Sequence, residues 1–594
     1  MTWIICFSVS VALLLLSIII SAVTSRRKSD RAQIVKPITV LFVGTFLSAV
    51  AMFIPVYAEY FEHQGQVVTG FKTFVISVHN TIRLFVIDSD FDLIHNSTIN
   101  LGEFLSTAYP ILACVLFVFA PLLTFSFILS FFKNVAAYAK YLLTFKKDAY
   151  VFSNLNLYSV TLAKDVYKNH KNAVIIFTDV KDSEDEDYEE LLEETRKIGA
   201  ILFRKELTLI NFNFHSKKSK ILFFILNRQE NENVNGYMNL VKQYYDRDLT
   251  EIFLFSMNST SDMVISSNAN SKIKVRRINS AQAVIYRNLY DRGEKIFETA
   301  LPVSPEKKVV SAVIIGLGNY GSSLTKALSW FCQMDGYTLK INVFDENEKA
   351  ESIFSSTCPE LMSEEYNGVI VPGESEYSIK IHSGINYKTK EFDEEISKIN
   401  DATFVFVCVG SDEANIACAV KTRMLFERIG VKPLINAVVY NAEQTKALEN
   451  ATNFKGQGYD IDYVGDVQST YSEAVIIDSE LEQEALERHK KYGNEEDFWR
   501  YEYNYRSSTA SAIHMRTRIK CKIPGADKKE EQLTKEEADL IEVLEHKRWN
   551  AYMRSEGYVH GDRRNDLAKV HHNLVCFDDL SEEDKLKDRI VGSK

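Results

Sequence analysis

Three long runs of apolar residues lie near the start of the chain, at 3–23, 38–56 and 108–132, and none of them contains a charged side chain. Each run is close to the ~20 residues that a helix needs to cross ~30 Å of hydrocarbon. After residue 132 the apolar positions fall into much shorter runs. The pattern therefore predicts a transmembrane region over residues 1–135, built from three helices, followed by a large water-soluble part.

Basic residues follow the first apolar run and do not precede it. Residues 24–36 hold five Lys or Arg and one Asp, whereas no Lys or Arg comes before residue 3. A cleaved signal peptide carries its positive charge in front of the apolar segment, so this distribution favours a retained anchor. By the positive-inside rule, residue 1 is outside and everything after residue 132 is cytoplasmic. We therefore expect a multi-pass protein of the cell (inner or plasma) membrane, with cytoplasmic C-terminal domains.

The segment between the second and third runs, residues 58–104, is too polar to span a membrane and too apolar for a plain loop. It is either a re-entrant segment of a pore or a small extracellular subdomain. In a pore, Asp88, Asp90 and Asp92 would offer oxygen ligands or a negative field to cations. In a subdomain, the same carboxylates would be solvated. The sequence leaves both interpretations open.

Beyond residue 148 short β-rich runs alternate with amphipathic helical stretches, which predicts βαβ units around mostly parallel sheets. Residues 309–326 read VVSAVIIGLGNYGSSLTK, which is a strand, a G-x-G-x-x-G turn and a helix. Such glycines let a pyrophosphate approach backbone N–H groups, and an acid at the next strand end can bond a ribose hydroxyl. The residues assigned to this site are Gly316, Gly318, Asn319, Tyr320, Gly321 and Asp345. We expect a Rossmann-like nucleotide-binding domain over 306–490, with an unliganded Rossmann shell as the alternative.

A later segment carries a family resemblance. Residues 402–424 contain Ser411, Asp412 and Asn415 after an apolar strand. Together with the glycine turn they resemble the TrkA-N or RCK type of Rossmann domain, which regulates potassium channels and transporters. In that family the loop after the fourth strand lies beside the nucleotide, so the resemblance implies that these three residues border the ligand. We expect NAD or a related nucleotide as the bound ligand. A pore made of so few helices per chain needs several chains, so we also expect a homo-oligomer, a dimer or a tetramer.

An earlier copy of the same pattern is visible at 150–166, where YVFSNLNLYSVTLAKDV aligns with the second copy at an offset of 162 residues. The three glycine positions are filled by Asn154, Asn156 and Ser159. A Cβ at each of them should close the turn against a pyrophosphate, although asparagine tolerates left-handed backbone angles and would then keep the turn. We expect a degenerate Rossmann domain over 148–295 that keeps the fold and has lost or changed its ligand.

The last segment, 498–594, contains Glu545-His546-x-Arg548-Trp549, followed by Glu556-Gly557-Tyr558-x-x-Gly561 and by His571-x-x-Leu574-Val575-x-Phe577. With these motifs it resembles the Ryr domain, a mainly helical repeat. Aromatic faces and guanidinium groups suit a base and a phosphate, although apolar and aromatic residues at helical spacing are more often core. The candidate pocket residues are Arg548, Trp549, Tyr552, Tyr558 and Arg563. His571, His572 and Cys576 lack a matched fourth ligand, so we expect no metal site.

The composition of the chain limits the kinds of partner that it is expected to bind. The chain has 594 residues, with 69 Lys and Arg against 80 Asp and Glu and a formal charge of −11, which does not favour a nucleic acid polymer as partner. Its eight cysteines contain no C-x-x-C pair, as is usual for reduced intracellular thiols.

Three classes of function fit these features. The leading hypothesis is a nucleotide-sensing, ligand-gated membrane protein, an RCK-regulated cation or potassium channel. An alternative is a defence or signalling sensor that disrupts the membrane when a nucleotide second messenger appears. A membrane-anchored NAD(P)-dependent oxidoreductase is the third, but no catalytic acid or base residues can be assigned after the glycine turn, so we expect no enzyme activity.

Overall fold

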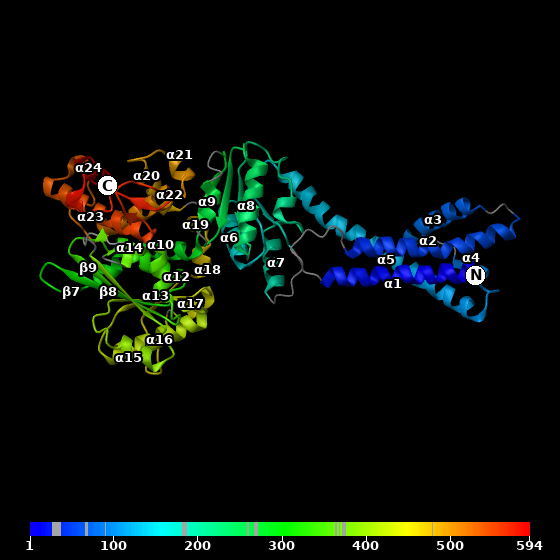
Figure 1. Ribbon diagram of the computed structural model, residues 1–594, viewed down its shortest axis with the longest axis horizontal. Helices are drawn as coiled ribbons and strands as arrows, with labels where there is room; N and C mark the ends of the chain where they lie inside the picture. Colours follow the sequence, from blue (N-terminus) through cyan, green and yellow to red (C-terminus); the bar gives the residue numbers. More distant parts are fainter. Residues whose placement is uncertain are drawn as a thin grey trace. The chain divides into compact units, whose positions relative to one another are not determined.

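The computed structural model describes residues 1–26, 37–65, 69–88, 91–180, 187–227, 229–257, 260–266, 271–362, 365–366, 369–370, 376–448, 450–477 and 479–594. The chain forms two compact units, Met1–Leu142 and Leu143–Lys594, and each is described by itself (Figure 1).

The first unit is helical. Its helices are α1 Thr2–Arg26, α2 Pro37–His63, α3 Gly70–Phe85, α4 Phe91–Thr98 and α5 Glu103–Thr144. Three stretches are long and apolar enough to cross a membrane, namely Thr2–Ala22, Ile38–His63 and Glu103–Ser126. The prediction of three candidate membrane helices is confirmed. The second span ends later than predicted, at His63, and the third begins earlier, at Glu103, while its helix α5 continues to Thr144. The basic residues at 27–36, which set the expected orientation, lie outside the described residues.

Polar side chains hold the helices of this unit together. The Ser10 hydroxyl on α1 donates to the Ser48 carbonyl oxygen on α2, and the Ser48 hydroxyl donates back to the Ser10 carbonyl oxygen, both at 2.8 Å. The Tyr109 hydroxyl on α5 donates to the Met52 carbonyl oxygen at 2.7 Å. Small hydroxyls let helices approach closely in lipid.

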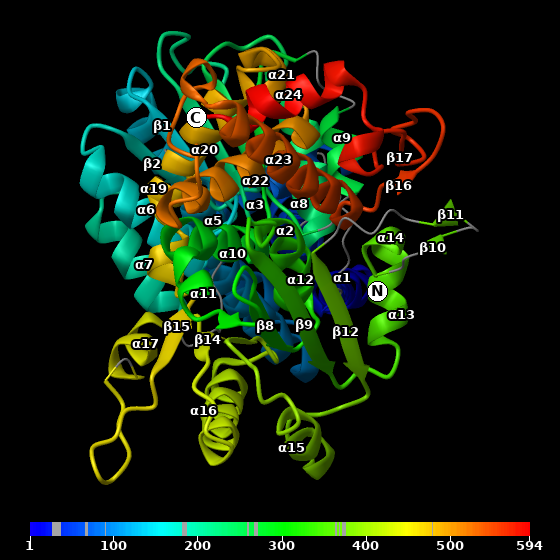
Figure 2. The ribbon, with the colours of Figure 1, turned by 90° about the vertical axis from the view of Figure 1, so that its left-hand side faces the viewer.

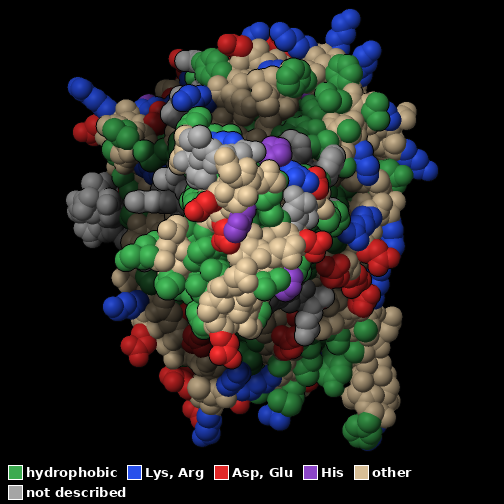
Figure 3. All heavy atoms as spheres, turned by 90° about the vertical axis from the view of Figure 1, so that its right-hand side faces the viewer, with side chains coloured by type: hydrophobic (Ala, Val, Ile, Leu, Met, Phe, Trp, Pro, Cys, Tyr) green, Lys and Arg blue, Asp and Glu red, His purple; other side chains and the backbone are tan. Residues whose placement is uncertain are grey.

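Helix α3 buries polar side chains on the face toward its own unit and exposes large apolar side chains. The buried polar residues are Thr73, Ser77, Asn80 and Thr81, and the exposed apolar residues are Phe71, Phe74, Val75 and Ile82. Figure 3 views this unit end on and shows hydrophobic side chains at its surface among acidic and histidine side chains. Such a pattern is typical of a helix in contact with lipid.

The three candidate pore aspartates are not equivalent. Asp88 receives two hydrogen bonds from Arg83, at 2.9 and 2.8 Å, and this guanidinium lowers the pKa of the Asp88 carboxyl. Asp92 is exposed in the first turn of α4. Asp90 lies outside the described residues. The Asp88 carboxylate is therefore already neutralised by a neighbouring cation.

The second unit contains two α/β regions with parallel sheets, as predicted. The first sheet contains β1 Ala149–Phe152, β2 Val174–Phe177, β3 Ile201–Leu202, β4 Ile221–Ile225, β5 Thr250–Phe255 and β6 Lys274–Ile278, in the order β3-β2-β1-β4-β5-β6. Ala149 lies opposite Val174 on one side and Ile221 on the other, in parallel register. The accompanying helices are α6 Leu157–Asn169, α7 Tyr188–Lys197, η1 Leu207–Leu209, α8 Glu230–Tyr244 and α9 Thr260–Ser266.

The second sheet has the same strand order. Its strands are β8 Lys308–Ile315, β9 Tyr337–Asp345, β12 Tyr377–Ser383, β13 Phe404–Val407, β14 Leu434–Val438 and β15 Ile461–Val464, in the order β12-β9-β8-β13-β14-β15, with β7 Leu301–Pro302 antiparallel to β8. The helices are α12 Asn319–Phe331, α13 Ala350–Thr357, α14 Pro359–Met362, α15 Lys390–Ile396, α16 Asp412–Arg428, α17 Ala442–Leu448, α18 Val467–Thr470 and α19 Glu473–Ile476. A short hairpin pairs β10 Glu365–Tyr366 with β11 Val369–Ile370. Counted along each sheet, both orders are 3-2-1-4-5-6, so the strand order reverses between strands 1 and 4, the position at which such sheets bind ligands.

Helices cover both faces of the second sheet. Val313 and Ile315 of β8 pack toward α15 and α16, whereas Ala312 and Ile314 pack toward α12 and toward α10 Ser280–Arg292. Figure 2 shows α15 and α16 on one side of this sheet and α12 on the other. Because both faces are buried, the strands read as continuous apolar runs, such as FVFV in β13.

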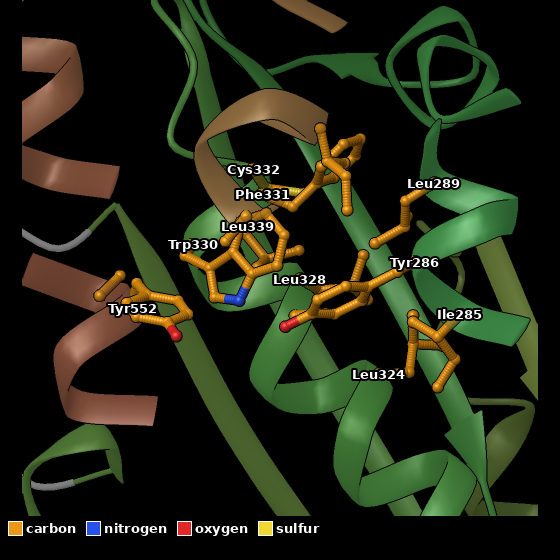
Figure 4. Close-up of a cluster of buried hydrophobic side chains, with 14 of the residues drawn as sticks. Ile285, Tyr286, Leu289, Leu324, Leu328, Trp330, Phe331, Cys332, Leu339 and Tyr552 are labelled. Carbon is orange, nitrogen blue, oxygen red and sulfur yellow. The ribbon is translucent and has the colours of Figure 1, made fainter. Parts of the chain in front are cut away.

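The C-terminal region is mainly helical and shares a core with the second sheet. Its elements are α11 Glu294–Glu298 before the sheet and α20 Glu480–His489, α21 Glu495–Arg500, α22 Glu502–Lys520, η2 Glu530–Gln532, α23 Lys535–Ser555, β16 Val559–His560, β17 Val570–His571, η3 Phe577–Asp579 and α24 Glu582–Gly592 after it. Figure 4 shows Tyr286 from α10, Trp330 from α12 and Tyr552 from α23 converging. The Trp330 ring centroid lies 5.7 Å from that of Tyr286 and 6.3 Å from that of Tyr552, both edge to face.

Candidate functional site

The glycine turn, residues 316–321, joins β8 to α12 at the carboxyl edge of the second sheet. Gly316 has φ +98°, and a Cβ there would lie 2.4 Å from the Cys408 carbonyl oxygen. A Cβ at Gly321 would lie 1.8 Å from the Gly316 carbonyl oxygen. A Cβ at Gly318 would meet no atom of the described residues within 4 Å, and its φ of −66° suits any residue. The fold itself therefore requires glycine at 316 and 321 and does not require it at 318.

The helix behind this turn begins without a side-chain cap. Gly318 is the N-cap of α12 and has no side chain that could accept hydrogen bonds from the first amides of the helix. Both Gly318 and Asn319 are exposed. The first N–H groups of a helix need an acceptor, and with the helix dipole they form a ready anion site. The turn therefore presents backbone donors to solvent at the place where a phosphate would bind.

The equivalent helix in the first sheet is capped by its own residues. Asn156, the N-cap of α6, accepts a hydrogen bond from the Ser159 amide at 2.9 Å, and the Ser159 hydroxyl accepts one from the Asn156 amide at 2.9 Å. The φ of Asn156 is −148°, so the turn is kept there without the left-handed conformation that asparagine tolerates. A capping box keeps the turn there and uses the amide that a phosphate would need.

Asp345 ends β9 beside the glycine turn. Its Oδ2 accepts a hydrogen bond from the Leu317 amide at 2.6 Å, and its Oδ1 accepts one from the Asn347 amide at 2.8 Å. The carboxylate therefore fixes the turn. A carboxylate offers about four lone-pair sites, so these two amides leave room for a hydroxyl donor such as a ribose.

Ser411, Asp412 and Asn415 have local partners in the structure. The Ser411 hydroxyl caps α16 by accepting from the Ala414 amide, and the Asp412 carboxylate accepts from the amides of Tyr440 and Asn441, each at 2.9 Å. These contacts tie the start of α16 to the end of β14. The polar groups expected to border a ligand thus support the edge of the sheet.

The Asn415 side chain links the ends of two strands by hydrogen bonds. It is 1% exposed, and its side chain accepts from the Val409 amide at 2.6 Å and donates to the Val438 carbonyl oxygen at 2.8 Å. In the first sheet Asn233 does the same, accepting from the Asn227 amide at 2.7 Å and donating to the Phe255 carbonyl oxygen at 2.9 Å. The shared signal is an asparagine six residues after the bonded amide, and the sequence comparison of the two copies missed it.

The glycine turn contacts the first sheet. The Asn319 side-chain nitrogen lies 2.9 Å from the sulfur of Met257, which follows β5. Tyr320 lies in a cluster with Tyr158, Tyr440 and Tyr471, called here the tyrosine cluster. The Tyr158 and Tyr471 rings stack with centroids 4.7 Å apart, and those of Tyr320 and Tyr440 lie 6.0 Å apart. Burial, and then the neighbouring Tyr440, raise the pKa of Tyr320. Tyr158 and Tyr320 come from the first turns of α6 and α12, so the carboxyl edges of the two sheets face each other here.

A separate cavity of about 450 Å³, called here the C-terminal cavity, lies among the last helices. Its lining residues include Tyr492, Tyr503, Asn504, Ser507, Ser511, Glu545, His546, Arg548, Trp549, Arg564, His571 and Lys587. Two of the five expected pocket residues, Arg548 and Trp549, line it.

The other three expected pocket residues lie elsewhere. Tyr552 is fully buried against Trp330, because the face of α23 that carries it packs on α12. Tyr558 is 7% exposed and its hydroxyl donates to Asp566. Arg563 is exposed, and its neighbour Arg564 lines the cavity in its place. The pocket assignment was therefore wrong for these three residues.

Within the part of the chain that the structure describes, no group of three or more His, Cys, Asp or Glu side chains is placed to hold a metal ion. His571 and His572 stack on each other with ring centroids 5.0 Å apart. Burial and then the charge of Arg564 lower the pKa of His571 to about 4.

Comparison of the chain with protein-family models found no match, and a search of curated proteins also found none.

Proposed function

We propose that this chain is a nucleotide-sensing membrane protein whose second sheet is a Rossmann-type receptor and whose membrane helices carry the response. The strand order 3-2-1-4-5-6 with a glycine turn at its first crossover is the arrangement that binds dinucleotides. The observation that carries the proposal is the uncapped start of α12 behind Gly318, a glycine that the fold does not need. A ligand that must approach the backbone closely explains why a side chain is missing there.

Different residues at the turn would bind different parts of the nucleotide. The first amides of α12 would donate hydrogen bonds to the phosphates of NAD or a related nucleotide, and Asp345 would accept a hydrogen bond from its ribose. Asn319 and Tyr320 extend from the same turn to Met257 and to the tyrosine cluster. A ligand at the turn would therefore lie beside the contact between the two sheets, and if its affinity depends on how the sheets meet, the ligand shifts that arrangement by linkage.

The chain connects this receptor to the membrane directly. Helix α5 continues from the candidate span Glu103–Ser126 to Thr144, and residues 145–148 separate it from β1. So few spans per chain need several chains to enclose a pore, so we propose a homo-oligomeric ion channel with its N-terminus outside and its second unit in the cytoplasm. A response that disrupts the membrane is the competing outcome of the flux measurement given at the end of the Discussion.

Ligand-dependent stabilisation tests the receptor. The full chain in detergent is heated with and without NAD, beside a Gly318→Asp variant. A ligand that binds the native state raises its apparent Tm in proportion to RT ln(1 + [L]/Kd). We expect NAD to raise the Tm of the wild type by more than that of Gly318→Asp. Equal shifts would place the ligand elsewhere, and steady oxidation of added NADH would indicate an oxidoreductase.

A further inference from the structure

The C-terminal cavity sits against an excess of buried positive charge. Arg488, Arg518 and Arg548 are each less than a tenth exposed, and Glu545, 1% exposed, is the carboxylate that all three share. Two further carboxylates line the cavity, Asp584 at 3.1 Å from the Lys587 ammonium and Asp588 at 3.3 Å from the His546 ring. The three guanidinium groups therefore outnumber the one carboxylate that they share. Buried charges of one sign are costly unless they are paired, so this cluster favours an anion.

Two of these arginines already have backbone partners. Arg518 Nη2 donates to the Gly592 carbonyl oxygen at 2.8 Å, and Arg488 donates to the Ser593 carbonyl oxygen at 3.3 Å. These carbonyl groups lie at the C-terminal end of α24, where the helix dipole is negative. They reduce the excess without supplying a full negative charge.

Arg548 differs because it lines the cavity, as neither Arg488 nor Arg518 does. Its Nε and Nη2 donate to Glu545 Oε1 at 3.1 and 2.7 Å, while Nη1 has no hydrogen-bond partner among the residues that the structure describes. An unmet donor on a buried cation is unfavourable. Its missing acceptor is one that an anion in the cavity would supply.

The pKa values of two neighbouring groups are shifted in the directions that the same positive charges produce. Burial alone would raise the pKa of Glu545, yet Arg548 and Arg518 overcome it and the pKa is lowered. Burial, and then Arg518 and Arg548, hold the pKa of His514 well below that of a free histidine. His514 therefore stays neutral and adds no charge to the cluster.

The walls of the cavity are aromatic on one side and carry hydrogen-bonding groups on another. Trp549 is half-buried and meets the His571 ring edge to face at 5.0 Å, and Tyr503 also lines the space. Along α22, Asn504, Ser507 and Ser511 share one helical face toward the cavity. Ring faces beside polar groups and a cation are what a nucleobase with a phosphate requires.

We infer that the C-terminal cavity is a second ligand site, which binds a nucleoside phosphate with its phosphate on Arg548 and its base against Trp549. The volume of about 450 Å³ lies within the usual range for small-molecule sites. The inference does not depend on the glycine turn, because none of the residues lining the cavity belongs to it.

The test uses the full chain in lipid nanodiscs, with Gly318→Asp to remove the first site. ADP, adenosine and inorganic phosphate are each titrated by calorimetry. We expect ADP to bind Gly318→Asp at one site per chain, with adenosine and phosphate each at least tenfold weaker. Absence of ADP binding to this variant, or adenosine binding as tightly as ADP, would overturn the inference.

Two variants in the same Gly318→Asp background assign the roles. Trp549→Ala should weaken ADP about tenfold or more and leave phosphate unchanged, since only the base loses a contact. Arg548→Lys keeps the charge that Glu545 needs and loses the planar fork, so it should weaken both ADP and phosphate. Tyr501→Ala, an exposed aromatic outside the cavity lining, is the matched control and should bind as its parent. Unchanged ADP affinity in Trp549→Ala would show that the ligand binds elsewhere.

Discussion

Gly318 is the most informative single position, because the fold tolerates a side chain there, whereas one that caps α12 or carries negative charge would compete with the proposed ligand. A Cβ at 318 has open space and an ordinary φ, unlike one at Gly316 or Gly321. Asn and Asp are the preferred N-cap residues and differ from Gly there by only a few tenths of a kcal/mol in stability. We therefore expect Gly318→Ala, Gly318→Asn and Gly318→Asp all to fold with a Tm close to that of the wild type.

Their effects on binding should differ in a fixed order. An Asn side chain that caps α12 accepts the hydrogen bond of one amide, which the phosphate then loses. A hydrogen bond to a charged group contributes about 1.5–3 kcal/mol, or roughly 10- to 100-fold in Kd. An Asp carboxylate also repels the phosphate by about 4 kcal/mol for unit charges ~4 Å apart at an effective dielectric constant near 20. That corresponds to roughly a thousandfold. The Ala variant adds a methyl group only and should lose less than about tenfold.

The assay is calorimetric titration of NAD into the full chain carrying Trp549→Ala, so that the C-terminal cavity contributes little. The expected order of affinity at position 318 is Gly, Ala, Asn, Asp, from tightest to weakest. Equal affinity for Gly and Asp, or a loss in Ala as large as that in Asp, would refute a phosphate on the α12 amides. A fall in Tm that accompanies the loss would point to misfolding and not to ligand repulsion.

Three further predictions concern other parts of the chain. Asn156→Ala removes the cap of α6 and should cost about 1 kcal/mol in urea unfolding, with NAD affinity unchanged; a loss of NAD affinity would mean that the first sheet binds it. A fluorophore at Phe74 on the outward face of α3 should be quenched by brominated lipid, whereas one at the exposed Lys217 should not; equal quenching would contradict a lipid-facing α3. The pKa of His571 is lowered from 6.5 to about 4 in the folded chain, so on acidification the unfolded chain binds the proton first. The stability that comes from the neutral histidine is therefore present at pH 7 and is lost as the pH falls from about 6.5 toward 4. The difference in unfolding free energy between wild type and His571→Asn should shrink over that interval, and a constant difference would refute it.

The features that local sequence determines were predictable. Three apolar runs gave the candidate membrane helices, and alternating strands and helices gave the two parallel-sheet regions. Both depend on the period and length of hydrophobic runs, which a single sequence shows directly. The glycine turn was predictable for a related reason, since Gly316 and Gly321 are needed by backbone geometry alone.

Other features depend on tertiary contacts that no local pattern reveals. Tyr552 was expected in a pocket and is buried against Trp330, because which face of α23 meets α12 is decided by packing between distant segments. Arg563 was preferred to Arg564, although adjacent residues in a loop point in different directions. Asn415 was expected beside a ligand and instead bonds two strand ends, a role visible only once both strands are in place.

The central claim is that a nucleotide at the glycine turn controls what the membrane helices do, and ion flux tests it most directly. The full chain is reconstituted into liposomes loaded with potassium and a small fluorescent dye, and NAD is added to the side that the second unit faces. We predict potassium release that depends on NAD, without release of the dye, and no release from the Gly318→Asp chain. Release of the dye as well would indicate a membrane-disrupting sensor, and flux that is the same with and without NAD, or in both chains, would contradict the account.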